Sequence, residues 1–238
     1  PHDIWGRKIT EDLPKGPGSE RILEMMKKRN EILKNHPVNQ KRIAKWLHPA
    51  NSIWIWGEGS KPNLDSFEEK YHVKGAVVSA VDLVKGIGVC AGMDVVEVEG
   101  ATGNIDTNFE GKAEAAINAL KNGCDLVYLH FEAPDECGHR GQVENKIKSI
   151  EYIDSRVTNY LLKELEEMGE DYSVLIMPDH PTPLSIKTHT RDAVPFLLYR
   201  SWDEKLHPDY TYDEKCAQKT GVYVERGCTL MEQLLRRR

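Results

Sequence analysis

The stretch that decides the fold is Asp125–His139, "DLVYLHFEAPDECGH", in which a largely apolar run is followed at once by Asp135 and His139. The run Asp125–Glu132 has the length and apolar character of a strand that is buried on both faces. A polar pair directly after such a strand falls where α/β sheets place their functional loops. The stretch therefore predicts an α/β fold and, at the carboxyl end of the strand, a candidate site.

Similar runs lie on either side of this stretch and alternate with helical patterns. Strands are predicted at Ser52–Gly57, Gly75–Val81, Asp94–Gly100, Asp125–Glu132, Ser173–Asp179 and Val194–Arg200. Helices are predicted at Glu20–Leu33 with Ser19 as the cap, at Asn39–Leu47, through Val84, at Gly111–Asn122, at Val143–Met168 and near Leu230. Such alternation is typical of a largely parallel sheet with helices on both faces.

The first part of the chain has a different pattern from the rest. It contains the loop sequence "LPKGPGSE" at Leu13–Glu20 and too few apolar residues to build a core of its own. We expect residues 1–50 to be the remnant of a second domain, or an arm that packs on the main one. Residues 51–238 are expected to form the main domain.

Composition limits the classes of function. The chain has 238 residues, of which 39% are hydrophobic and 29% charged, as in a globular protein. A net charge of −6 makes nucleic acid an unexpected partner. Nothing approaches the ~20 apolar residues of a membrane span. The five cysteines form no C-x-x-C pair, which favours a reducing cytoplasm. Cys137 is not expected to be a metal ligand.

Polar side chains cluster at three predicted strand ends. Asp135 and His139 follow the fourth strand, Asp179 and His180 follow "SVLIMP", and His189 precedes the last strand. Taken singly, each could be surface polarity, a helix cap or a turn. Together they supply carboxylates and imidazoles, which are the ligands of divalent metals, in numbers sufficient for parts of two sites.

Two adjacent metal sites would have a defined chemical use. Ions ~3.5–4 Å apart can hold the attacking and leaving oxygens of a phosphoryl group. The mixture of oxygen and nitrogen ligands suits manganese, zinc or cobalt better than calcium.

Four segments resemble the cofactor-independent phosphoglycerate mutases of archaeal type, which belong to the alkaline phosphatase superfamily. They read "NLDSFEEKYHVKGAVVSAVDLVKGIG", "GATGNIDTNFEGKAEAA", "FEAPDECGHRG" and "MPDHPTPLSIKTHTRDAVPFLLY". The resemblance extends from about Ile53 to Tyr199. It implies an alkaline phosphatase-like core and two divalent ions, which could be Mn, Zn, Co or Mg. One ion would be held by Asp135, His139 and His189, and the other by Asp179 and His180.

The resemblance also implies an activity in the cytoplasm: the interconversion of 2-phosphoglycerate and 3-phosphoglycerate, a small three-carbon substrate, through a phosphoserine. The family completes its second ion with an Asp near the N-terminus and with the nucleophilic Ser. Neither segment is present here. The core is therefore expected to be incomplete, residues 1–50 to come from the inserted cap domain, and the chain to be inactive by itself.

Further residues are expected to contact the substrate. Lys85, in "DLVKGIG", is expected to be a cation that offsets charge on the phosphoryl group. His2, Asp3, Arg7 and Arg191 are expected to contact the glycerate. Two alternatives stay open. A homoserine kinase-like phosphotransferase or a phosphatase would reuse the same metal pairs, and a non-catalytic metal-binding fragment would keep them without the nucleophile.

Overall fold

The computed structural model describes residues 8–55, 57, 59–203 and 209–236 of the chain. The chain divides into two units, Pro1–Lys61 and Pro62–Arg238. His2, Asp3 and Arg7, which are expected to contact the glycerate, lie outside the described residues. The boundary between the two units lies after Lys61, whereas the sequence analysis placed it after residue 50. The origin of the first unit in an inserted domain stays a prediction.

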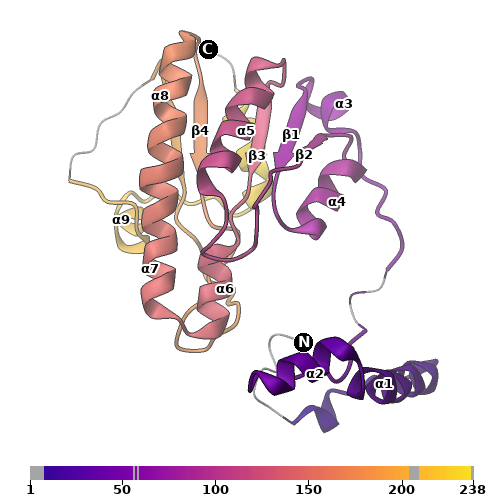
Figure 1. The fold of residues 1–238 in the computed structure, drawn as a ribbon. Coiled ribbons are helices and arrows are strands. Elements are labelled where there is room, and N and C mark those ends of the chain that lie inside the picture. The colour runs from indigo at the N-terminus through magenta and orange to yellow at the C-terminus, as the bar shows by residue number, and fades with distance from the viewer. Residues whose placement is uncertain (1–7, 56, 58, 204–208, 237–238) are drawn as a thin grey trace. The chain divides into compact units, whose positions relative to one another are not determined.

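The first unit is helical. It contains η2 (Ile9–Glu11), α1 (Ser19–Lys34) and α2 (Pro37–Ala44) (Figure 1). Gly18, at φ 83°, precedes α1, and Ser19 is the first residue of the helix; the prediction that Ser19 caps it is therefore wrong. Asn39 is 2% exposed, and its side chain bonds to the backbone of Leu33 and Ala50. This buried amide joins the two helices to the segment that follows them.

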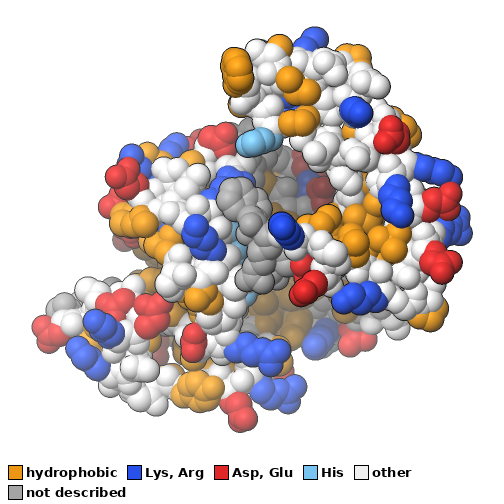
Figure 2. All heavy atoms as spheres, turned by 90° about the horizontal axis from the view of Figure 1, so that it is seen from below, with side chains coloured by type: hydrophobic (Ala, Val, Ile, Leu, Met, Phe, Trp, Pro, Cys, Tyr) orange, Lys and Arg blue, Asp and Glu red, His pale blue; other side chains and the backbone are white. Residues whose placement is uncertain are grey.

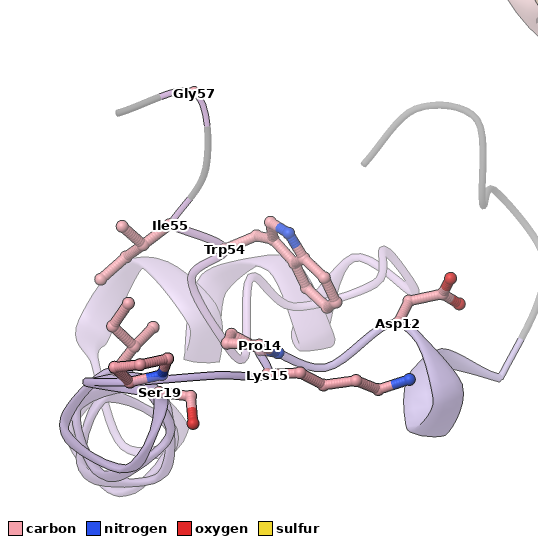
Figure 3. Close-up of a pocket in the computed structure, with 9 residues that line it drawn as sticks. Asp12, Pro14, Lys15, Ser19, Trp54, Ile55 and Gly57 are labelled. Carbon is pink, nitrogen blue, oxygen red and sulfur yellow. The ribbon is translucent and has the colours of Figure 1, made fainter. Parts of the chain in front are cut away.

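The predicted strand at Ser52–Gly57 is wrong for its described residues. Residues 52–55 have no regular structure, and Trp56 lies outside the described part. Trp54 and Ile55 instead line a pocket of 330 Å³ with Pro14 and Lys15 (Figure 3). Their apolar side chains are half-buried by packing within the first unit, so the apolar run reflects this contact rather than strand pairing.

The second unit is α/β. Its elements are α3 (Phe67–Tyr71), β1 (Gly75–Val78), α4 (Asp82–Cys90), β2 (Asp94–Val96), α5 (Phe109–Lys121), β3 (Leu126–Leu129), α6 (Ala133–Arg140), α7 (Val143–Tyr152), η3 (Ile153–Thr158), α8 (Asn159–Met168), β4 (Ser173–Ile176), β5 (Leu197–Arg200), α9 (Glu214–Lys219), η4 (Gly227–Thr229) and α10 (Leu230–Leu234). The other predicted strands are all found, with shorter bounds. The predicted helix at Val143–Met168 is found as α7, a π-helical segment η3, and α8 in direct succession (Figure 1).

The strands form two sheets. β1 lies between β2 and β3, and both pairings are parallel. β4 and β5 pair in the antiparallel direction as a separate sheet. All four residues of β1 are buried, so both of its faces are covered. The prediction of an α/β fold with a parallel sheet flanked by helices is confirmed, and the antiparallel pair is an addition to it.

A compact core joins the sheet to its helices. Phe109 at the start of α5 is 0% exposed and packs with Ala133 and Val157. Its ring stacks on Phe131 with 5.4 Å between centroids and meets Tyr152 edge-on at 5.6 Å. Because Phe131 and Ala133 link β3 to α6, this core fixes where α6 leaves the sheet.

The surface carries both signs of charge. On the face drawn in Figure 2, Lys and Arg side chains are interspersed with Asp and Glu, and no extended patch of one sign is visible there. Among the described residues, no helix combines the length and the apolar character that crossing a bilayer requires.

Candidate metal centre

The short helix α6 presents Asp135 and His139 on one face. Pro134 lies in its first turn, where a missing N–H costs nothing, and Gly141 ends the helix at φ 67°. Acidic residues in the first turn and basic residues in the last complement the helix dipole. Because residues four apart are neighbours on a helix, Nε2 of His139 lies 3.3 Å from Oδ2 of Asp135.

The segment between β4 and β5 brings the other predicted ligands to α6. Nε2 of His189 lies 3.2 Å from Oδ1 of Asp135 and 3.0 Å from Nε2 of His139. The ring centroids of His180 and His189 are 3.7 Å apart, and Oδ2 of Asp179 is 3.4 Å from Nε2 of His180. The structure thus gathers all five predicted ligands; we call Asp135, His139, Asp179, His180 and His189 the His–Asp cluster.

The backbone sets the orientation of one imidazole in the cluster. Nδ1 of His139 lies 2.9 Å from the carbonyl oxygen of Lys187, and a carbonyl can only accept, so this nitrogen carries the proton. Lys187 adopts a positive φ of 56°, and the carbonyl that accepts this hydrogen bond belongs to the same residue. The arrangement points Nε2 of His139 at Asp135 and His189, and in the neutral imidazole this nitrogen carries the lone pair. A metal-binding histidine usually donates its other ring N–H to such a carbonyl.

The donor set of the cluster fits divalent ions. Ligand atoms of Asp135, His180 and His189 all lie within 4.8 Å of one another. Two carboxylates and three imidazoles are the mixture that manganese, zinc and cobalt accept. The side chains of His139 and Asp135 are the most buried of the cluster, at 10% and 20% exposed, whereas that of Asp179 is 67% exposed to solvent.

Glu132 is a neighbour of the cluster that the sequence analysis did not single out. It forms a group of carboxylates with Asp135 and Glu136 whose oxygens lie within 4.8 Å of one another. Burial raises the pKa of Glu132, and the charges of Asp135 and Asp179 raise it further. Its place between β3 and Asp135 in "FEAPDE" was a signal available in the sequence.

Next to Glu132, the side chains of His130, Ser79 and Lys112 form a set of polar contacts. Nε2 of His130 is 3.3 Å from Oε2 of Glu132, and its Nδ1 is 3.1 Å from Oγ of Ser79. Lys112 of α5 is 1% exposed, donates to the carbonyl oxygen of His130, and lies 4.0 Å from the centroid of the Phe131 ring. Burial lowers the pKa of Lys112 to about 8. The pKa of His130 is also lowered, first by burial and second by the positive charge of Lys112.

Three other residues named from the sequence are not members of the His–Asp cluster. Lys85 is on α4, where its Nζ lies 3.1 Å from Glu97 and 3.3 Å from Asp82; hydrogen bonds to these two carboxylates raise its pKa. Arg191 is exposed in the segment before β5. Cys137 is 2% exposed, and residues two apart on a helix do not share a face, so it points away from Asp135.

Comparison with known proteins adds the family. Residues 20–234 match the model of the metalloenzyme superfamily. The chain is 52% identical, over 237 residues, to a protein of Geobacter sulfurreducens named probable 2,3-bisphosphoglycerate-independent phosphoglycerate mutase, and this covers 100% of the chain and 59% of that protein. A protein of Methanosarcina barkeri named 2,3-bisphosphoglycerate-independent phosphoglycerate mutase is 49% identical, with 99% and 59% covered. The chain thus spans 59% of the length of these relatives.

Solved structures show the same fold. The PH0037 protein from Pyrococcus horikoshii matches 85% of this chain and 53% of its own with a TM-score of 0.65 at 35% identity. A cofactor-independent phosphoglycerate mutase from Thermoplasma acidophilum matches 91% and 51% with a TM-score of 0.54. At 22% identity, this second likeness concerns the fold alone.

Proposed function

Because the chain belongs to the metalloenzyme superfamily, we propose that it is the metal-holding part of a 2,3-bisphosphoglycerate-independent phosphoglycerate mutase. The observation that carries the proposal is the convergence of the His–Asp cluster from α6 and from the segment between β4 and β5. The similarity to proteins of that name along the whole chain supports it. The reaction is the interconversion of 2-phosphoglycerate and 3-phosphoglycerate, in the cytoplasm.

The cluster would hold two divalent ions, with manganese, zinc, cobalt and magnesium as candidates. Asp135, His139 and His189 hold one ion, and Asp179 and His180 contribute to the second. When bound, such ions offset negative charge on the transferred phosphoryl group and favour an ionised attacking hydroxyl. The chain's own contribution is positional: the hydrogen bond from Nδ1 of His139 to the carbonyl of Lys187 orients the ring so that Nε2 points at its neighbours.

The nucleophilic serine and the Asp that completes the second site are proposed to lie outside this chain, within the part of the relatives' length that it does not span. The serine accepts the phosphoryl group from one hydroxyl of the glycerate and returns it to the other. Lys85 is proposed as a cation for the phosphoryl group, and Arg191 as a contact of the glycerate, together with His2, Asp3 and Arg7. By this reasoning the chain alone is inactive.

A titration of the chain with Mn²⁺ tests the metal sites. Isothermal calorimetry should detect binding, and Asp135→Asn or His139→Ala should weaken it roughly 100-fold, because each removes a ligand. Glu144→Gln, an exposed carboxylate on α7, is the matched control and should bind as the wild type does. Unchanged affinity in both ligand variants would remove the proposal.

An activity assay tests the reaction. A chain extended to the full length of its relatives is supplied with 3-phosphoglycerate and Mn²⁺, and formation of 2-phosphoglycerate is followed through an enolase-coupled absorbance change. We expect turnover with the extended chain and none with the 238-residue chain. Phosphate release without isomerisation would instead identify a phosphatase.

A further inference from the structure

A lysine and a threonine outside the His–Asp cluster join the two segments that carry it. Lys146 of α7 points its Nζ at two carbonyl oxygens, that of Pro134 in α6 at 3.0 Å and that of Thr182 at 3.1 Å. Pro134 precedes Asp135, and Thr182 lies two residues after His180. One ammonium group therefore ties the backbone of the helix to the backbone of the β4–β5 segment.

A glycine permits this close approach. Gly138 of α6 is buried, and a Cβ at its position would lie 2.6 Å from the carbonyl oxygen of Thr182 and 3.1 Å from Nζ of Lys146. A real Cβ does not approach a backbone oxygen so closely, so only glycine lets the segment lie against this turn of the helix. The contact between α6 and Thr182 is thus part of the packing of the unit.

The hydroxyl of Thr182 reaches one residue of each proposed ion site. Thr182 is 5% exposed; its Oγ1 donates to Oδ1 of Asp135 and lies 3.3 Å from Nδ1 of His180. A hydroxyl has one proton to give, and the carboxylate can only accept it. Nδ1 of His180 is then the donor to Oγ1, and in the neutral imidazole this tautomer leaves Nε2 with its lone pair.

From these contacts we propose that Thr182 and Lys146 are positioning residues of the metal centre. Thr182 sets the rotamer of Asp135 and the tautomer of His180, and so couples the two ion sites. Lys146 holds the backbone of Thr182 against α6, at the distance at which these hydrogen bonds form. The inference rests on the proposed function, because it assumes that the His–Asp cluster holds metal.

The test compares variants of similar shape in the same chain. Thr182→Val keeps the shape of the side chain and removes the hydroxyl, whereas Thr182→Ser keeps the hydroxyl. Lys146→Met keeps the apolar stem, and Lys148→Met, an exposed lysine on the same helix, is its control. Each is titrated with Mn²⁺, and the visible absorption of Co²⁺ is recorded, because the band positions report coordination geometry independently of activity.

We expect Thr182→Val and Lys146→Met to weaken Mn²⁺ binding about 10- to 100-fold and to shift the Co²⁺ bands. Thr182→Ser and Lys148→Met should match the wild type. Circular dichroism identifies variants that fail to fold; should Lys146→Met do so, the Val and Ser pair decides the question.

The outcomes separate the two proposals. If the wild type binds Mn²⁺, Asp135→Asn weakens it, and Thr182→Val binds with wild-type affinity and an unshifted Co²⁺ spectrum, the positioning role is overturned and the proposed function stands. If the wild type does not bind Mn²⁺, or Asp135→Asn has no effect, the proposed function falls and the inference falls with it.

Discussion

Replacing Lys112 by methionine should change how stability depends on pH. Lys112 is 1% exposed, and burial lowers its pKa to about 8 from an ordinary 10.5. Folding therefore places a charged lysine in an unfavourable environment below pH 8, and a pKa difference of this size corresponds to roughly 3 kcal/mol. Methionine fills a similar volume and has no proton to lose.

The sign follows from counting protons. Between pH 8 and 10.5 the unfolded chain keeps the proton on Lys112 while the folded chain releases it, so the unfolded state binds more protons and stability rises with pH. Relative to Lys112→Met, the wild type should gain about 1.4 kcal/mol between pH 7 and pH 9. The lost hydrogen bond to the carbonyl of His130 adds an offset that does not depend on pH.

Urea unfolding at pH 7, 8 and 9, followed by circular dichroism, measures this difference. Using the difference between two proteins cancels the titration of the groups that do not interact with Lys112. His130 does interact with it, but its pKa is lowered from an ordinary 6.5, so it titrates below the pH range of the comparison. Lys148→Met, which removes an exposed lysine, should give a difference from the wild type that is flat across the same range. A flat difference for Lys112→Met as well would show that the Lys112 proton is retained in the folded state, and the reasoning from burial would be wrong.

Two further predictions concern α5. Phe109→Ala should lower the free energy of unfolding by about 3–5 kcal/mol in urea titration, because Phe109 is 0% exposed and contacts two aromatic rings. Asn108→Ala should cost about 1–2 kcal/mol, because Oδ1 of Asn108 accepts from the N–H of Gly111 at 2.9 Å and caps the helix. Asn118→Ala, exposed on the same helix, should change stability by less than about 0.5 kcal/mol; an equal cost at Asn118 would contradict the capping argument.

Local pattern was sufficient to predict most of the strands and the gathering of the cluster. β1, β3 and β4 are apolar runs, and polar residues that follow the strands of an α/β sheet are expected to lie at one edge. β4 pairs with β5 in a separate antiparallel sheet, so the position of Asp179 and His180 depends on the β4–β5 segment. Ser52–Gly57 shows the limit of the same reasoning. Its continuous apolar run is as good as that of a buried strand, but Trp54 and Ile55 pack within the first unit. An apolar pattern indicates which side chains are buried, but it does not identify the segment against which they pack.

The direction of β5 and the helix α6 could not be read from the sequence for two different reasons. β4 and β5 pair antiparallel, and this depends on the route of the segment between them, which has no regular pattern. The helix α6 has eight residues, with Pro134 at its start and Gly138 inside it, so its intrinsic helix propensity is low. It is stabilised by its contacts, among them the burial of Ala133 in the core and the hydrogen bonds from Lys146.

The helix α6 also explains why the cluster is more specific than a list of its ligands. In an extended loop, Asp135 and His139 would have no fixed relation, whereas one helical turn places them 3.3 Å apart before any ion arrives. The β4–β5 segment has no regular structure of its own to fix His180 and His189 in the same way. Its order must come from long-range contacts, and the hydrogen bond from Thr182 to Asp135 joins residues 47 apart in the chain. Thr182, between two prolines, reads in the sequence as a turn, because the feature that gives it a role lies on another element.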